Sequence, residues 1–323
     1  MKFRTDLDSP SSNVKITYDS SICMFGSCFS DSIGGKLLQN KLKVLKNTFG
    51  TLYHPSAIRK NLLDTSPPTE GDIVQIDNRF VHYDLHSDIF ALSASDLLKR
   101  IKKQRAATHM FLTQCDFVFI TLGTAFHFYH KTLNRIVANC HKQPGHLFER
   151  RLSSVKEVIE DLQALVNYIE KVNADANIVL TVSPIRHLRD GLVENNRSKS
   201  HLLTAVHEIC DTHEKTQYFP SYELIIDDLR DYRFYKSDMI HPSRQAIEYV
   251  YNKLKQTYMD QKTLNIICSV EKIMKSIDHR PIDPKSTQHQ AFLKQLKSSM
   301  ASLSKSYNID FDDELASVNH QII

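Results

Sequence analysis

The sequence predicts an α/β protein built on a parallel β-sheet with helices on both faces. Short, continuously apolar segments, typical of buried parallel strands, alternate with longer segments that carry apolar residues at helical spacing. This alternation continues from about residue 22 to residue 255. Glycines follow the first three predicted strands, at the sheet edge where folds of this kind bind their ligands.

The stretch 22–38 predicts a strand that turns sharply into a helix. A Gly-Ser-Cys turn lies at 26–28, and Ser30 or Asp31 is the expected helix cap. Side chains in such a turn lie beside the N–H groups and the positive dipole of the new helix. A thiol there has a lowered pKa, and backbone donors are available to an oxyanion. The alternative is an ordinary strand-to-helix turn, in which small residues are common.

The other elements of the α/β pattern follow in chain order. Strands are predicted at 42–45, 115–124, 177–182 and 217–220, and helices at 56–63, 95–103, 153–171 and 197–213, with a last helix that opens at 238–243 and runs to about 255. Residues 73–92 indicate an irregular or hairpin-like excursion, and 137–144 indicate a loop.

From about residue 258 the pattern changes to helices only, and Pro281 and Pro284 separate two helical pieces. We therefore predict two units: an α/β domain at 1–257 and a helical C-terminal appendage at 258–323. The appendage packs either on the core or on a partner.

Composition excludes several classes of function. With 41% hydrophobic and 24% charged residues, the 323-residue chain has an ordinary globular composition. No apolar run reaches the ~18 residues of a membrane span, and no secretion signal is visible. The formal charge of +4 is evenly spread, which does not favour nucleic acid. We expect a cytoplasmic protein without a membrane or nucleic-acid partner.

The cysteines and histidines do not predict a metal centre. The six cysteines form no C-x-x-C pair, so we expect reduced thiols. His82 and His86 are four residues apart and His127 and His130 three apart, but the carboxylates or paired thiols of a zinc motif are missing. We expect no metal and no cofactor.

Four features are predicted to gather at one sheet edge. Residues 26–28, Gly50 and 123–124 follow the first three strands, although the chain has only eight glycines. The fourth feature is the Asp-x-x-His-Pro segment of Asp238 and His241. A carboxylate at this spacing can hold the imidazole Nδ1–H and leave Nε2 as a general base. The alternative is a helix-capping aspartate near a surface histidine.

This order of motifs resembles the SGNH (GDSL-type) hydrolase superfamily and, within it, the GSCFA family, named after its N-terminal motif. That motif is Gly-Ser-Cys-Phe-Ser at 26–30 here, and stretches at 121–125, 137–144, 183–187, 228–235 and 238–242 are also similar. The resemblance covers roughly residues 1–255. It implies a flavodoxin-like three-layer α/β/α fold and a bacterial protein, and it leaves the substrate open.

The first departure from the superfamily pattern concerns the nucleophile. Its serine is the third residue of Gly-Asp-Ser, and an ungapped match puts Cys28 there and Ser27 at the aspartate. We prefer Cys28, because a thiol at a helix N-terminus with a histidine base is an activated arrangement. If the turn shifts, Ser27 is the nucleophile instead. The third possibility is that Cys28 is a buried structural thiol.

The second departure removes an oxyanion donor. The third block is normally Gly-x-Asn, and Ala125 replaces the asparagine. Such a donor contributes about 3–4 kcal/mol to transition-state stabilisation. Asn139 or Thr124 are candidate replacements, and the backbone N–H groups of Cys28 and Gly50 are further donors. Without a replacement for this oxyanion donor, we expect the site to catalyse its reaction slowly or to bind a ligand without reacting.

Further candidates for substrate contact follow other strands and loops. Arg186 and His187 come directly after a predicted strand, where an arginine can clamp a carboxylate or phosphate. A surface ion pair is the alternative. His141 and Lys142 are candidates of the same kind.

The resulting hypothesis is a hydrolase or transferase of acyl esters or thioesters that acts on a small-molecule or glycan substrate. His241, oriented by Asp238, would deprotonate Cys28 or Ser27 for attack on the carbonyl carbon. One rival is a catalytically silent ligand-binding module, which Ala125 favours. Another is a redox sensor at Cys28, for which no resolving cysteine is evident.

Overall fold

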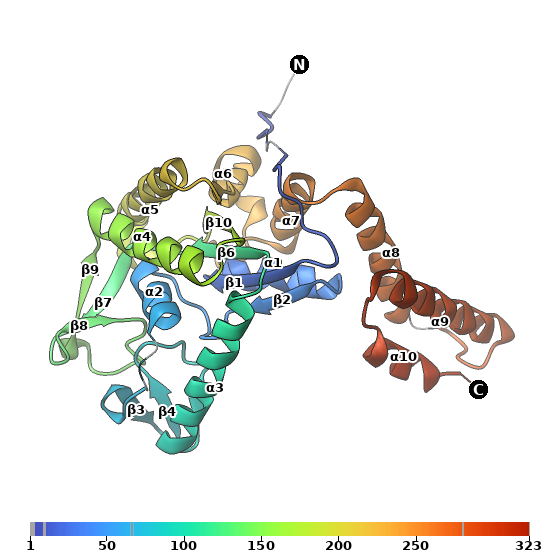
Figure 1. The fold of residues 1–323 in the computed structure, drawn as a ribbon, viewed down its shortest axis with the longest axis horizontal. Coiled ribbons are helices and arrows are strands. Elements are labelled where there is room, and N and C mark those ends of the chain that lie inside the picture. The colour runs from blue at the N-terminus through green and yellow to red at the C-terminus, as the bar shows by residue number, and fades with distance from the viewer. Residues whose placement is uncertain (1–3, 9–10, 65, 67, 280, 323) are drawn as a thin grey trace.

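The computed structural model describes residues 4–8, 11–64, 66, 68–279 and 281–322. Its centre is a parallel sheet with the strand order β11-β10-β6-β1-β2 (Figure 1). The strands are β1 (Ser21–Gly26), β2 (Lys43–Lys46), β6 (Phe117–Leu122), β10 (Asn177–Val182) and β11 (Thr216–Tyr218). In chain order this is the 2-1-3-4-5 arrangement of flavodoxin-like folds. The predicted fold class is therefore confirmed.

Each face of the sheet has its own apolar core. Ile22 and Met24 of β1 contribute to the core beneath α1 and α7, whereas Cys23 and Phe25 contribute to the core beneath α2, α3, α4 and α5. This alternation follows the two-residue period of a strand, and burial on both sides explains why the inner strands β1, β6 and β10 are mostly apolar. The helices of these layers are α1 (Cys28–Gln39), α2 (Pro55–Leu63), α3 (Ala94–Leu112), α4 (Val155–Val172), α5 (Leu192–Thr212) and α7 (Arg244–Tyr258).

Two small antiparallel sheets extend from the central sheet. One has the order β3-β4-β5 and confirms the hairpin-like excursion predicted at 73–92; the other has the order β8-β7-β9. Their strands are β3 (Ile73–Ile76), β4 (Arg79–His82), β5 (Phe90–Ala91), β7 (Phe126–His130), β8 (Arg135–Val137) and β9 (Phe148–Leu152). The second sheet was not predicted, because its strands are short and rich in histidine and arginine.

Three helix boundaries differ from the sequence-based expectation, and one of them is the start of α5 at Leu192 instead of 197. Helix α3 continues to Leu112, because Thr108 occupies a buried position on its inner face and hides the apolar period. Helix α7 begins only at Arg244, where Ser243 is the N-cap. The segment 238–242 is therefore a loop before the helix, and not its first turn.

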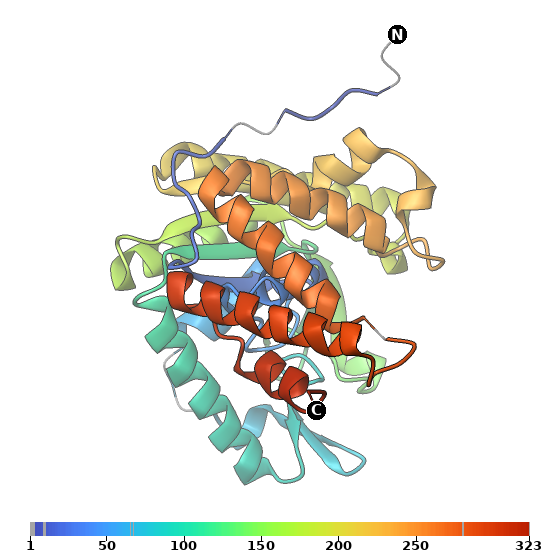
Figure 2. The same ribbon diagram turned by 90° about the vertical axis from the view of Figure 1, so that its right-hand side faces the viewer.

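The C-terminal part consists of α8 (Gln261–Ile277), α9 (Thr287–Tyr307) and α10 (Asp312–Asn319). These helices lie on the side of α7 away from the antiparallel sheets (Figures 1 and 2). Their apolar residues join the same continuous core that includes α1 and α7. They therefore pack on the α/β core, which is one of the two arrangements predicted.

Short helical segments complete the connections. They are η1 (Glu70–Asp72), η2 (Gly145–Leu147), η3 (Leu188–Asp190), α6 (Ser221–Glu223), η4 (Leu224–Leu229) and η5 (Tyr232–Phe234). Within the described part of the chain, no helix has both the length and the apolar character that crossing a membrane requires.

Candidate functional site

The turn between β1 and α1 is shaped by close contact with β6. Gly26 has φ +132°, and a Cβ there would lie 2.0 Å from the Thr121 carbonyl oxygen. The N–H of Ser27 donates to the same oxygen at 3.0 Å. Only glycine fits this position, because a side chain would collide with the neighbouring strand. The turn therefore has one geometry, and it sets where Ser27 and Cys28 point.

Ser27 and Cys28 occupy different environments. Ser27 is fully buried, and its Oγ accepts a hydrogen bond from the Phe29 N–H at 3.3 Å, so it is the N-cap of α1. This cap replaces the one expected at Ser30 or Asp31. Cys28 is the first residue of α1, is half-buried, and lines a cavity.

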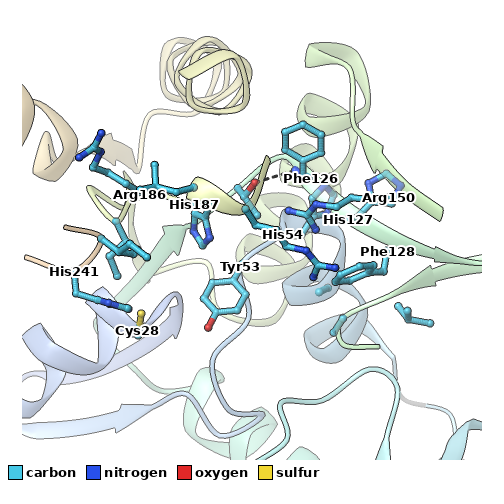
Figure 3. A pocket seen from close by; sticks show the side chains of 18 residues that line it. Cys28, Tyr53, His54, Phe126, His127, Phe128, Arg150, Arg186, His187 and His241 are labelled. Carbon is cyan, nitrogen blue, oxygen red and sulfur yellow. Dashed lines mark hydrogen bonds between the residues drawn. The ribbon is translucent and has the colours of Figure 1, made fainter. Parts of the chain in front are cut away.

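The cavity has a volume of about 360 Å³ and opens beside the C-terminal ends of β1 and β6. Its lining consists of Cys28, Tyr53, His54, Ala57, Thr124, Phe126, His127, Phe128, Val137, Ala138, Arg150, Ile185, Arg186, His187, Leu188, Arg189, Ile240 and His241. In Figure 3 the imidazole of His241 points toward the sulfur of Cys28. Residues more than two hundred positions apart thus meet at one site.

His241 is oriented by Asp238. The Asp238 carboxylate accepts hydrogen bonds from the Ile240 N–H at 2.8 Å and the His241 N–H at 3.0 Å. Its second oxygen lies 2.8 Å from His241 Nδ1. The hydrogen bonds from the His241 and Ile240 N–H groups, with the imidazole, lower the pKa of Asp238 to about 2. The carboxylate is therefore ionised and holds the proton on Nδ1, which leaves Nε2 as an acceptor.

The loop that carries His241 is fixed from two sides. The Arg186 N–H donates to the Ile240 carbonyl at 3.2 Å, and the Arg186 guanidinium donates to the Met239 carbonyl at 3.3 Å. On the other side, Tyr235 forms an antiparallel bridge with Pro242. Arg186 therefore contacts the loop through its guanidinium and points away from Cys28, as Figure 3 shows. The structure places it as a support for the histidine loop.

Burial and nearby charges act in opposite directions on Cys28. Burial is the largest influence and raises the pKa of the thiol. Its own backbone N–H at the start of α1 favours the thiolate, as do the ammonium groups of Lys236 and Lys199, whereas Asp31 disfavours it. The expected lowering at a helix N-terminus is therefore outweighed by burial.

The candidate oxyanion donors are mostly engaged in other bonds. The Gly50 N–H donates to the Asn47 carbonyl at 2.8 Å. Thr124 lines the cavity, but its N–H donates to the Tyr53 carbonyl at 3.2 Å and its hydroxyl lies 3.0 Å from Ser198 Oγ. The N–H of Ala125 donates to Ser198 Oγ at 2.8 Å. These groups stabilise the strand ends.

Asn139 and His141 lie away from Cys28, in the loop after β8. Asn139 Oδ1 accepts the His141 N–H at 2.9 Å, and His141 Nε2 lies 2.8 Å from the His82 carbonyl oxygen. Burial lowers the pKa of His141. His141 connects this loop to the end of β4, Asn139 bonds within the loop and to the Tyr83 carbonyl, and neither is among the described residues that line the cavity.

His187 does line the cavity, packed edge-on against Tyr53 at 5.4 Å between ring centroids. Burial lowers its pKa to about 3, so the ring is neutral. Its Nε2 is buried and has no hydrogen-bond partner within the described ranges. This ring nitrogen lies beside Gly123, where a Cβ would be 3.3 Å from it, so it faces the protein interior.

Sequence reasoning missed two residues beside Cys28. Lys199 is buried, and its Nζ donates to the carbonyls of Gly123 at 2.5 Å and Ser183 at 2.6 Å, just past the ends of β6 and β10. Burial lowers its pKa to about 7. The Tyr53 hydroxyl points into the cavity on the Cys28 side (Figure 3), and burial raises its pKa to about 12. Lys199 lies within helix α5, and no motif in the surrounding sequence indicates that its side chain is buried near Cys28.

One group of side chains has the composition of a metal site. Ligand atoms of Asp72, His82 and Asp84 lie within 4.8 Å of one another. Arg135 bonds to both carboxylates, at 2.6 Å to Asp84, and Lys60 lies 2.8 Å from the other Asp84 oxygen. Because cationic side chains already neutralise the carboxylates, the cluster is an ion-pair network that joins β4 to β8. All six cysteines are free thiols in the structure.

Comparison with protein-family models decides the family. The model of the GSCFA family matches residues 21–254, and that of the GSCFA domain protein C-terminal domain matches residues 270–323. The chain belongs to the GSCFA family. A comparison with curated protein sequences finds no match.

Comparison with solved structures finds esterases and a lipase-like protein at low identity. A carbohydrate esterase family 3 from Talaromyces cellulolyticus is 8% identical with a TM-score of 0.37, over 77% of this chain and 98% of that one. A GDSL-like lipase candidate from Parabacteroides merdae is 14% identical with a TM-score of 0.39, over 77% and 98%. The acetyl xylan esterase Est2A from Butyrivibrio proteoclasticus is 11% identical with a TM-score of 0.38, over 75% and 64%.

Proposed function

We propose that this GSCFA protein hydrolyses or transfers acyl groups from esters or thioesters, with Cys28 as nucleophile, His241 as general base and Asp238 as the residue that orients it. The observation that carries the proposal is that Cys28 and His241 line one cavity, with the imidazole of His241 held by Asp238 at 2.8 Å and directed toward the sulfur. Cys28 is favoured over Ser27, whose hydroxyl is buried as the cap of α1.

The chemistry proceeds in two halves. His241 Nε2 takes the thiol proton as the Cys28 sulfur attacks the carbonyl carbon. The tetrahedral intermediate collapses, the carbon–oxygen or carbon–sulfur bond breaks, and the leaving group receives the proton from His241. Water or an acceptor hydroxyl then loses a proton to His241 and attacks the acyl-cysteine, which releases the acid or a new ester and restores the thiol. The substrate is a small-molecule or glycan acyl ester or thioester.

The oxyanion in this scheme is held by the Cys28 N–H and the Tyr53 hydroxyl. The Cys28 N–H lies at the N-terminus of α1, where the helix dipole favours negative charge. The raised pKa of Tyr53 keeps its hydroxyl protonated as a donor at neutral pH. Tyr53 would thereby replace the asparagine that Ala125 removes.

The second candidate function is a ligand-binding module without catalysis. It is favoured by the raised pKa of Cys28, which keeps the thiol protonated at neutral pH, and by the engaged N–H group of Ala125. In this case the cavity binds an acyl compound and leaves it intact.

Trapping of the acyl-enzyme separates the two functions. Incubation with p-nitrophenyl acetate, followed by mass spectrometry of peptides, is expected to show acetylation of Cys28 that is lost in Cys28→Ala and strongly reduced in His241→Ala. Acetylation or fluorophosphonate labelling at Ser27 would transfer the nucleophile role to that residue. If neither residue is modified while nitrophenol release stays at background, the binding module is the better description.

A further inference from the structure

The charges that line the cavity are of one sign. The described lining contains the arginines Arg150, Arg186 and Arg189 and no aspartate or glutamate. A concave site lined by cations attracts anionic ligands and raises their local concentration. The three arginines differ in whether their guanidinium N–H groups are already bonded to the protein.

Two of the three arginines already bond to other groups of the protein. Arg150 forms a paired contact with Asp190, with Nη2 and Oδ2 2.5 Å apart, and its guanidinium lies 5.0 Å and 5.1 Å from the ring centroids of Phe126 and Phe128. Arg186 donates to the Met239 carbonyl and lies over tyrosine rings outside the cavity.

Arg189 is different. Its guanidinium lies 5.2 Å from the centre of the Phe128 ring, and it is exposed. No ion pair or side-chain hydrogen bond joins it to another residue in the described ranges. Its neighbour Asp190 cannot neutralise it, because the Asp190 carboxylate is bound by Arg150 with both oxygens. Five N–H donors on a planar cation are therefore unused at the rim of the cavity.

The position of this cation relates it to the proposed reaction. Phe128 and Arg150 lie across the cavity from Cys28 and His241 in Figure 3. A ligand that fills about 360 Å³ between them can place a carbonyl at Cys28 and a second group beside Phe128. Arginine pairs with carboxylate and phosphate groups through two parallel hydrogen bonds.

We propose that Arg189, with its guanidinium stacked on Phe128, is an anion-binding subsite of this cavity, so that the acyl substrate carries a carboxylate or a phosphate remote from the reacting carbonyl. This inference rests on the proposed acyl transfer at Cys28. Arg186, the arginine singled out by its place after a strand, has a different role as support of the His241 loop.

Pairs of substrates that differ only in charge test the subsite on the full chain. One pair places the charge on the acyl group: p-nitrophenyl hemisuccinate and p-nitrophenyl butyrate. The other places it on the leaving group: S-acetyl pantetheine 4′-phosphate and S-acetyl pantetheine. In one pair we expect kcat/KM to be about tenfold higher for the anionic member, the effect of one charge-assisted contact. The pair that shows it identifies the source of the anion.

The variant Arg189→Gln keeps a long polar side chain and removes the charge. We expect its ratio of anionic to neutral kcat/KM to fall to about one. The matched control is Arg197→Gln, an exposed arginine on α5 that pairs with Glu194 outside the cavity and should leave the ratio unchanged. The preference of the unmodified protein should also weaken as the salt concentration rises.

The outcomes separate this subsite from the proposed function. If the neutral esters are turned over in a Cys28-dependent manner and neither pair shows a charge preference that Arg189→Gln abolishes, the subsite is wrong and acyl transfer stands. If no ester is turned over, titration with succinate and with inorganic phosphate decides. Binding weakened about tenfold in Arg189→Gln supports the subsite alone, and equal binding overturns it.

Discussion

The Asp238 carboxylate accepts hydrogen bonds from two backbone N–H groups and one imidazole, although it is exposed to solvent. In Asp238→Asn the amide cannot stabilise a positive imidazole and can offer a donor to Nδ1, which favours the wrong tautomer. We expect kcat for ester hydrolysis to fall by about 10²–10⁴, as for loss of a positioned base. Steady-state hydrolysis of p-nitrophenyl acetate measures it. Activity within a factor of about two of wild type would show that Asp238 only shapes the loop.

Lys199 lies under the site and influences Cys28 through its charge. In Lys199→Met no ammonium can form, so the pKa of Cys28 should rise further, by less than loss of a fully charged lysine would give, because the pKa of Lys199 is itself lowered to about 7. The pH dependence of iodoacetamide alkylation at Cys28, read by mass spectrometry, measures this shift. Because the variant leaves two carbonyls without their donor, Lys236→Gln at an exposed position is the companion variant and should act in the same direction. If the pH dependence of Cys28 alkylation is unchanged in both variants, neither lysine affects the pKa of the thiol.

At the scale of elements, the turn before α1 depends on one glycine. Gly26→Ala would place a Cβ 2.0 Å from the Thr121 oxygen at φ +132°, so the turn must open and either the fold or the position of Cys28 is lost. The matched control is Gly35→Ala in the middle of the same helix, where a Cβ meets nothing within 4 Å. We expect that control to stabilise the protein by about 0.5–1 kcal/mol. Thermal unfolding monitored by circular dichroism compares the two, and equal midpoints would contradict the strained turn.

Helix α2 contains an acid-sensitive cap. His54 is the N-cap residue, and its Nδ1 accepts the Ser56 N–H at 3.1 Å, which requires a neutral ring. Burial lowers its pKa from about 6.5 to about 3, so between these values the unfolded chain binds more protons than the folded protein. This histidine therefore lowers stability as the pH falls through that window, by about 1.4 kcal/mol per unit.

The variant His54→Asn keeps an acceptor suited to an N-cap and removes the titration. Urea unfolding at pH 7, 6, 5 and 4 should show a shallower loss of stability than in the wild type. A slope equal to that of the wild type would mean that other groups dominate the acid response.

The sequence predicts elements well where local pattern and burial agree. The three inner strands of the central sheet, β1, β6 and β10, are buried on both faces and mostly apolar, so their position and the layer arrangement follow directly. The antiparallel sheet β8-β7-β9 is missed because its strands are held by backbone pairing between segments that loops separate in the sequence. These strands also contain charged side chains such as Arg150 and Arg151, so they lack the apolar pattern of a buried strand. Thr108 hides the second half of α3 for a similar reason: a polar residue is buried where the period requires an apolar one.

For the site, motif order predicts which segments meet but not which atoms are free to react. Cys28 and His241, two of the features expected at one sheet edge, line the same cavity, and so does His187, a candidate because it follows a predicted strand. The bonds that engage the N–H of Gly50 and the hydroxyl of Thr124 arise from loop contacts that no local pattern encodes. Lys199 is revealed only when α5 is packed against the ends of β6 and β10.

For the whole molecule, we propose that residues 258–323 form an appendage whose stability is coupled to the α/β core. Val270 of α8 is fully buried in the apolar cluster that includes α1 and α7. Val270→Asp would bury an unpaired charge there and should lower the free energy of unfolding by about 3–5 kcal/mol. Asn265→Asp, at an exposed position of the same helix, is the control. A separate early transition with an unchanged main one would show that the appendage folds independently.

Lys199 has a practical consequence for chemical probing. Its amine is buried and bonded to the Gly123 and Ser183 carbonyls, so acylating or methylating reagents that mark solvent-accessible amines should leave it unmodified while the protein is folded. Brief denaturation before labelling would expose it, and the difference between the two peptide maps gives a direct readout of whether the strand ends beside Cys28 are still assembled.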